Sequence, residues 1–157
     1  MKKNGILAFL IILIMGQGFS QNVENPRNAS PENLKGTLAI QGYDPVAYFK
    51  QGRPIKGRPE LSVAHGEATY YFSSPSNKAL FIKNPSLYAP QYGGWCAYAM
   101  GASNELVEIN PETFKIVDGK LYLFYHTPFV NTLKKWDQKE QLLKSRADLH
   151  WKKRSGH

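Results

Sequence analysis

Three prolines, each preceded by a residue that can cap a helix, limit where the helices of this chain can begin. They lie in the pairs Asp44-Pro45, Ser74-Pro75 and Thr127-Pro128. Proline fixes φ and lacks an N–H group, so it fits the first turn of a helix, and Asp, Ser or Thr before it can cap that helix. We therefore expect three helices that begin at these pairs, the first ending before Gly52 and the second at Asn84-Pro85.

Two β-hairpins are predicted between these helices. One turns at Gly66-Glu67 and spans residues 61–73, and the other turns at Asp118-Gly119 and spans residues 114–125. Residues 88–101 are rich in aromatic, glycine and small side chains, which favours irregular backbone or a buried strand over a helix.

The last predicted helix has an amphipathic stripe. Apolar residues recur in it at multiples of three and four positions: Phe129, Leu133, Trp136, Leu143 and Ala147. A stripe of this kind covers a sheet. The sequence therefore predicts an α+β fold, with a small antiparallel sheet of roughly five strands packed by short helices and one long C-terminal amphipathic helix.

The N-terminus has the order of a secretory signal. Lys2 and Lys3 precede an apolar run over Ile6–Met15, and small side chains follow at Gly18 and Ser20. The run is too short to cross a bilayer of roughly 30 Å as a helix. We expect cleavage after Ser20, export to the periplasm or the extracellular space, and no stable membrane anchor in the mature protein.

The polar residues that follow this signal contain two prolines and no apolar period, which indicates a flexible segment. We therefore predict four parts: a signal peptide at 1–20, a flexible lead-in at 21–35, one folded domain at 36–151 and a basic tail at 152–157.

The formal net charge is +8. The densest basic part is C-terminal and contains Lys144, Arg146, Lys152, Lys153 and Arg154. It is either a patch for anionic lipid, glycan or nucleic acid, or a solvated helix end whose cations offset the helix dipole, and we favour the second interpretation. Aromatic side chains do not interleave with these charges as single-strand binding requires, so we expect no nucleic-acid partner.

Cys96 is the single cysteine of the chain. No intramolecular disulfide can form, so stability must come from one hydrophobic core. Two glycines precede this residue, and aromatic side chains flank it. Three interpretations stay open: a buried inert thiol, a ligand for a soft metal, or a nucleophile.

A soft-metal site would combine the thiolate of Cys96, the thioether of Met100 and the imidazole of His65 or His126. This set suits Cu(I) better than Mg²⁺ or Ca²⁺, and a zinc site would need further ligands. We rank His126 above His65 because it lies between a strand and a helix, where loops carry function. The same two histidines are the candidate bases if Cys96 is a nucleophile.

A pocket for a small ligand is the other candidate site. Aromatic walls with a few polar groups are its usual form. The predicted lining residues are Tyr43, Asp44, Tyr92, Trp95 and Tyr98.

Three motifs resemble the exported single-domain branch of the YHS domain family. They are GYDPVAYF at 42–49, the stretch 65–98 that contains QYGGWCAY, and IVDGKLYLFY at 116–125. The resemblance covers the chain from about Gly36 to near Trp151 and implies a fold and an association with metal handling. Shorter relatives carry metal-binding cysteines where this chain has Ala47 and Ser73, so that thiolate site is not carried over, and the exported branch has no established activity.

These observations predict an exported, non-enzymatic binding protein that holds a soft metal ion, copper or zinc, or a small ligand near Cys96. The alternative is a thiol-dependent enzyme that uses Cys96 with a histidine base. A third hypothesis is an interaction module whose basic C-terminal helix meets an anionic surface.

Overall fold

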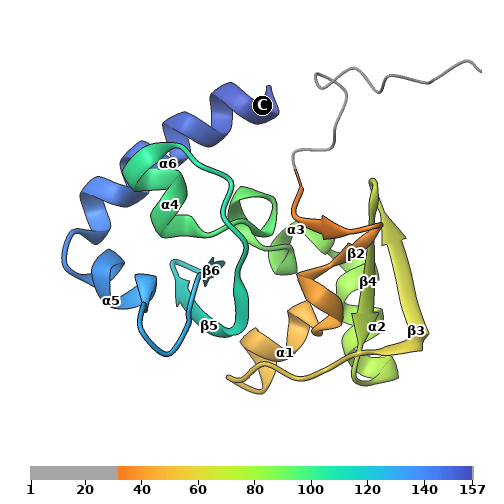
Figure 1. Cartoon of the computed structure of the whole chain (residues 1–157). Coiled ribbons are helices and arrows are strands. Elements are labelled where there is room, and N and C mark those ends of the chain that lie inside the picture. The colour runs from red at the N-terminus through yellow and green to blue at the C-terminus, as the bar shows by residue number, and fades with distance from the viewer. Residues whose placement is uncertain (1–31, 157) are drawn as a thin grey trace, which may run out of the picture.

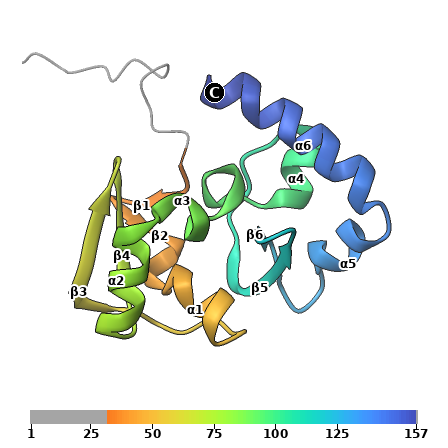
Figure 2. The ribbon, with the colours of Figure 1, turned by 180° about the vertical axis from the view of Figure 1, so that it is seen from behind.

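The computed structural model describes residues 32–156, which form two halves that lie side by side (Figures 1 and 2). The predicted signal peptide and residues 21–31 of the lead-in lie outside the described residues. The α+β class is confirmed, with strands in both halves and a long C-terminal helix.

The first half is built around a four-stranded sheet in the order β1-β2-β4-β3. Its strands are β1 (Leu34–Lys35), β2 (Leu38–Ala39), β3 (Arg58–His65) and β4 (Ala68–Phe72). The helical elements of this half and the connection to the next are η1 (Ile40–Gly42), α1 (Pro45–Lys50), α2 (Pro75–Lys83), α3 (Pro85–Tyr88) and η2 (Gln91–Gly94).

The second half contains a two-stranded sheet and three helices. Its elements are α4 (Ala97–Ser103), β5 (Asn110–Val117), β6 (Lys120–Phe124), α5 (Thr132–Asp137) and α6 (Glu140–Ser155). The predicted basic tail begins inside α6, which continues to Ser155. Among residues 32–156, no helix has the length and apolar character needed to span a bilayer.

Two of the three predicted helix starts are confirmed. Asp44 caps α1, where its Oδ1 accepts hydrogen bonds from the N–H groups of Val46 and Ala47, and Ser74 caps α2 by accepting one from the N–H of Asn77. Proline occupies the first turn of both helices. The local chemistry of cap and proline is therefore sufficient to place these starts.

The third predicted helix start, at Thr127-Pro128, is wrong. The N–H of Thr127 donates to Val130 O at 2.8 Å, so Pro128 lies in a closed turn. Asn131 caps α5 instead, because its Oδ1 accepts hydrogen bonds from the N–H groups of Leu133 and Lys134. As a result Phe129, which we expected in the apolar stripe, is 95% exposed, whereas Trp136, Leu143 and Ala147 are buried.

Both predicted hairpins are confirmed, but the strands divide into two sheets rather than one antiparallel sheet of about five strands. β2 pairs with β4 in the parallel direction. The fold also begins before Gly36, because Asn33 donates hydrogen bonds from its N–H and its side-chain amide to the carbonyls of Gly93 and Gly94. Residues 33–35, predicted to be flexible, are therefore part of the first half.

Residues 88–101 contain more helix than we predicted, because α4 begins at Ala97. Cys96 precedes this helix and forms an isolated parallel bridge with Leu123. The buried strand that we considered for this segment is thus limited to a single bridge beside β6.

Two hydrophobic clusters fill the core, and β6 contributes to both. Leu121 and Leu123 belong to the first cluster, with Cys96, and Tyr122 and Phe124 belong to the second. Because alternate residues of a strand point to opposite faces, β6 is buried on both sides. This strand joins the two halves of the molecule.

Candidate functional site

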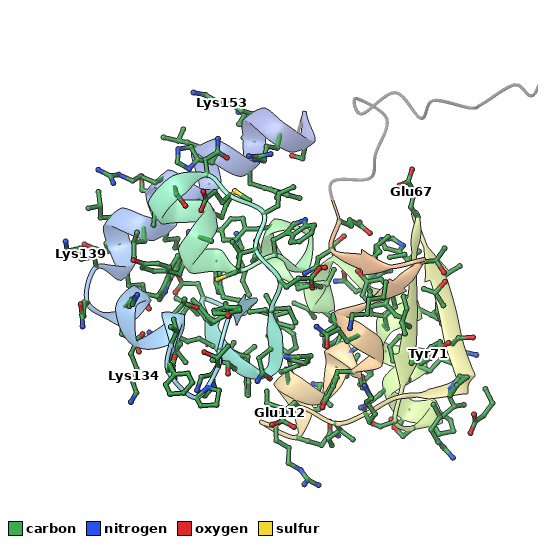
Figure 3. All side chains as sticks on the ribbon, in the orientation of Figure 1. Glu67, Tyr71, Glu112, Lys134, Lys139 and Lys153 are labelled. Carbon is green, nitrogen blue, oxygen red and sulfur yellow. The ribbon has the colours of Figure 1, made fainter. Side chains whose placement is uncertain are left out.

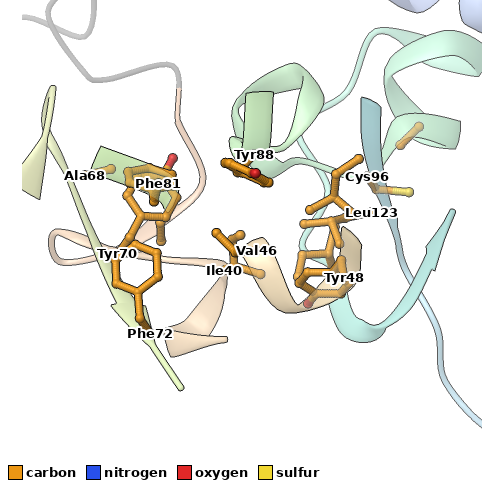
Figure 4. Close-up of a cluster of buried hydrophobic side chains, with 14 residues drawn as sticks. Ile40, Val46, Tyr48, Ala68, Tyr70, Phe72, Phe81, Tyr88, Cys96 and Leu123 are labelled. Atoms are coloured by element: carbon orange, nitrogen blue, oxygen red, sulfur yellow. The ribbon is translucent and has the colours of Figure 1, made fainter. Parts of the chain in front are cut away.

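The thiol of Cys96 is fully buried and is bound on two sides by groups of the second half. The backbone N–H of Tyr125 donates to Sγ at 3.4 Å, and Thr132 Oγ1 lies 3.4 Å from Sγ. Cys96 lies at the end of the first cluster that is nearest β6 (Figure 4).

The hydrogen bonds of Thr132 decide which atom donates to which. Its hydroxyl has one proton, and that proton is donated to the carbonyl of Tyr125 at 2.8 Å. The contact between Cys96 Sγ and Thr132 Oγ1 must then be made by the S–H group as donor. These contacts give the Cys96 side chain a structural role and favour the first of the three interpretations, a buried thiol.

The histidines predicted to accompany Cys96 contact other parts of the molecule. His65 is exposed on β3, pairs with Ala68 and stacks edge-on against Phe81. Ala68 and Phe81 lie at the opposite end of the first cluster from Cys96 (Figure 4). His126 is exposed, and its Nδ1 lies 3.0 Å from Thr113 Oγ1 on β5.

Met100 lies one turn after Cys96 but is buried in the second cluster, whereas Cys96 belongs to the first. In the part of the chain that the structure describes, no three side chains of His, Cys, Asp or Glu are grouped so that they could hold a metal ion. The predicted set of Cys96, Met100, His65 and His126 is therefore not assembled. Cys96 and Met100 belong to different clusters, and His65 lies beside Ala68 and Phe81 at the far end of the first, so the structure gives a copper or zinc site at Cys96 no support.

Asp44, predicted to line a ligand pocket, is fully buried and binds the protein itself. Besides capping α1, it accepts hydrogen bonds at Oδ2 from the N–H and hydroxyl of Ser73 at 2.8 and 2.6 Å and from the amide of Asn77 at 2.7 Å. All its acceptor positions are used to join α1, the end of β4 and α2. The role of Asp44 is structural.

The other predicted pocket residues are divided between the two halves. Tyr43 is half-buried, with its hydroxyl 3.4 Å from Glu112 Oε1 and its ring 4.4 Å from Lys56 Nζ. Tyr92 is buried in the second cluster, and its hydroxyl donates to Asp148 at 2.9 Å. Burial is the main cause that raises the pKa of Tyr92, and the hydrogen bond to Asp148 raises it further.

Trp95 is half-buried and follows η2 in the chain, and its backbone N–H donates to the carbonyl of Tyr92. Tyr98 is half-buried on α4. It was one of the five residues predicted to line a pocket, and it lines a pocket in the structure.

This pocket, which we call the α4–α6 cleft, is an open hollow of about 600 Å³ between α4, α5 and α6. Its lining residues are Tyr98, Ala102, Lys135, Gln138, Lys139, Leu142, Leu143 and Arg146. Three of them are cations and none is acidic. Apolar and aromatic side chains lie among the cations, so the cleft offers both positive charge and apolar surface.

The cleft exists because α6 crosses close to α4 while α5 stands beside them. A Cβ atom on Gly101 would lie 2.3 Å from the carbonyl oxygen of Leu143, so the two helix backbones approach as only glycine permits. Trp136 is fully buried, and its Nε1 donates to Glu140 at 3.1 Å across the break between α5 and α6. These contacts direct Lys135 and Lys139 to the rim of the cleft.

Three ion pairs join the acidic groups of α5 and α6 to Lys115 and Lys144, which do not line the cleft. Asp137 and Glu140 both bind the ammonium of Lys115 on β5, whose pKa these hydrogen bonds raise. Asp148 binds Lys144 and Tyr92. The residues that line the cleft therefore include three cations and no acidic side chain, so the lining carries a net positive charge.

Sequence reasoning did not identify Lys135, Lys139 and Leu142 as site residues. Lys135 and Lys139 are four residues apart in the sequence, but this spacing alone does not predict a site. The break between α5 and α6 is what lets both lysines line the same cleft as Tyr98. Lys135 Nζ lies 5.8 Å from the centroid of the Tyr98 ring.

The fold and the site together define a small α+β domain with an open cationic cleft. Comparison of the chain with protein-family models, with curated proteins and with solved structures gives no match. The resemblance to the YHS domain family therefore stays a prediction.

Proposed function

We propose that this chain is an exported, non-enzymatic binding protein that holds a small anionic ligand with an apolar part in the α4–α6 cleft. The observation that carries the proposal is the lining of the cleft, in which Lys135, Lys139 and Arg146 surround Tyr98 and Leu142 without an acidic side chain. Apolar walls with a few charged groups suit a ligand that is apolar at one end and negatively charged at the other.

The proposal keeps the class of protein predicted from the sequence and moves the site. The ligand was expected near Cys96, whose thiol is buried and hydrogen-bonded, and Tyr98 is the residue that the predicted pocket and the cleft share. No histidine is among the hydrogen-bond partners of the thiol, so a nucleophile activated by a base gains no support from the geometry.

The test uses two fluorescent dyes of similar shape, anionic anilinonaphthalene sulfonate and its neutral analogue phenylnaphthylamine. We expect the protein to bind the anionic dye more tightly. Arg146→Glu should weaken binding of that dye by about tenfold, the loss expected for one charge-assisted contact. Binding of the neutral dye should change little, because it depends on Tyr98 and Leu142.

Lys83→Glu is the matched control, because Lys83 is an exposed cation on α2, in the other half of the molecule. It changes the net charge as Arg146→Glu does but leaves the cleft intact. The proposal is overturned if neither dye binds, if the two dyes bind equally, or if Lys83→Glu weakens binding as much as Arg146→Glu.

A further inference from the structure

Phe129 lies at the tip of a short, well-defined turn and is 95% exposed. The turn is closed by hydrogen bonds between Thr127 and Val130, in which the N–H of each residue donates to the other and Val130 also donates to the Thr127 hydroxyl. Phe129 lines a second hollow of about 330 Å³ with His126, Lys134 and Lys135. An aromatic ring is thus held out into solvent directly beside two cations.

The outer side of α6 carries the same combination of apolar and basic groups. Leu142, Arg146, Leu149 and Lys153 are spaced by four, three and four residues, so they form one stripe along the helix. Leu142 is 48% and Leu149 is 59% exposed. These leucines are left uncovered on a helix that buries only Leu143 and Ala147.

The turn and the helix stripe form one continuous surface, which we call the basic face. Lys135 belongs to both hollows, and Leu142 and Arg146 belong to both the cleft and the stripe. The basic face consists of Phe129, Lys134, Lys135, Lys139, Leu142, Arg146, Leu149 and Lys153. Its labelled members Lys134, Lys139 and Lys153 lie along one margin of the molecule, whereas Glu67 lies on the far side (Figure 3).

The acidic side chains of α5 and α6 do not oppose this charge. Asp137 and Glu140 form ion pairs with Lys115, and Asp148 forms one with Lys144. Glu140 also accepts a hydrogen bond from Trp136 Nε1. None of the residues that line the two hollows or form the stripe is acidic.

We propose that the basic face docks reversibly on an anionic phospholipid membrane. Leucine and phenylalanine side chains interspersed with lysine and arginine match the acyl boundary and the negative headgroups that such a surface offers together. A single-stranded nucleic acid would instead require several stacking aromatic side chains along the charges, and the basic face has one, Phe129. The inference goes beyond the proposed function, because Phe129, Leu149 and Lys153 lie outside the cleft.

The test measures partition of the exported protein onto vesicles by co-sedimentation. We expect binding to vesicles of equal parts phosphatidylglycerol and phosphatidylcholine, weak binding to phosphatidylcholine alone, and a loss of binding at high salt. Phe129→Ala and Lys153→Glu should each lower the partition coefficient about threefold or more, and the double variant about tenfold or more.

Leu87→Ser and Lys83→Glu are the matched controls, because both residues are exposed on α2 and α3 in the other half of the molecule. All variants have the same N-terminus, so any contribution of that segment to vesicle binding is equal in all of them. Differences in partition coefficient among the variants therefore come from the substituted residues. The inference is overturned if the anionic and neutral vesicles bind alike, if Phe129→Ala partitions as wild type does, or if the controls lower binding equally. Binding to a single-stranded oligonucleotide without binding to vesicles would also overturn it.

Dye binding separates the two proposals. Phe129→Ala should weaken vesicle binding and keep affinity for anilinonaphthalene sulfonate, because the residue does not line the cleft. If the dye does not bind but vesicle binding depends on Phe129, the proposed function fails and the membrane inference stands.

Discussion

Asp44 is the polar residue on which the first half depends most. Its carboxylate is fully buried and accepts five hydrogen bonds, from Val46, Ala47, Asn77 and both donors of Ser73. A buried charge is tolerated only when its acceptor positions are filled in this way.

We expect Asp44→Asn to lower the free energy of unfolding by about 3 kcal/mol, because the new NH₂ group would face backbone and side-chain donors that already point at the carboxylate. The change in the free energy of unfolding is measured from urea unfolding curves monitored by circular dichroism. Asp118→Asn is the control: Asp118 is exposed at a positive φ that Asn tolerates, so its effect should stay within about 0.5 kcal/mol. Equal stability of the two variants would contradict a structural role for Asp44.

Cys96 gives a second prediction at the scale of one residue. Its Sγ is enclosed by Tyr125, Thr132 and the first cluster, so a thiol reagent can reach it only when the fold opens. We expect an aromatic disulfide reagent to react with the folded protein at least about a thousandfold more slowly than with the chain in urea. Reaction of the folded protein at the rate of the unfolded chain would show an accessible thiol and restore the nucleophile hypothesis.

At the scale of elements, the crossing of α4 and α6 determines whether the cleft forms. The close approach at Gly101 brings Leu143 of α6 against α4 and sets the distance between Tyr98 and Arg146 on the cleft walls. The site therefore depends on a glycine that does not line it.

In an exposed helix, replacing glycine by alanine stabilises by about 0.5–1 kcal/mol. We expect the opposite for Gly101→Ala, a loss of about 2 kcal/mol or more, because its Cβ would meet the backbone of Leu143 at 2.3 Å and overpack the crossing. The variant should also bind the anionic dye less tightly. The sign of the stability change decides the matter: a more stable Gly101→Ala would contradict this account of the crossing.

At the scale of the whole molecule, β6 lies between two hydrophobic clusters that neither half could enclose alone. Leu123 faces the first cluster and Phe124 the second, and both are fully buried. Because the two clusters share one strand, loss of packing on either side should destabilise the entire fold.

We therefore expect Leu123→Ala and Phe124→Ala each to lower the free energy of unfolding by about 3 kcal/mol or more. Each variant should still unfold in one transition. Far-ultraviolet circular dichroism and tryptophan fluorescence, to which the buried Trp136 of the second cluster contributes, should follow the same urea curve. Separate transitions for the two probes would show that the halves fold independently.

The same scales separate what could be read from the sequence from what could not. Asp44-Pro45, Ser74-Pro75 and the turn at Asp118-Gly119 were predicted correctly because cap, proline and turn chemistry act within a few residues. The start at Thr127-Pro128 was predicted wrongly because Thr127 and Asn131 are both competent caps, and Asn131 caps α5. The turn closed by Val130 decides between them.

The candidate site was harder to predict than the fold. Residue types suggested that Cys96, Met100 and the histidines could form a site, but they are divided among two clusters and two surfaces. The cleft was missed because its members become neighbours only through a close helix crossing and a helix break.

The sequence by itself determined the α+β class, the two hairpins, the starts of α1 and α2 and the apolar residues that bury the C-terminal helix, since these follow from interactions between residues close in the chain. Only the tertiary structure decided the division into two sheets, the burial of Cys96 and the gathering of Lys135, Lys139 and Arg146 around Tyr98. Those features depend on which surfaces meet, and that is set by burial and packing between segments far apart in sequence.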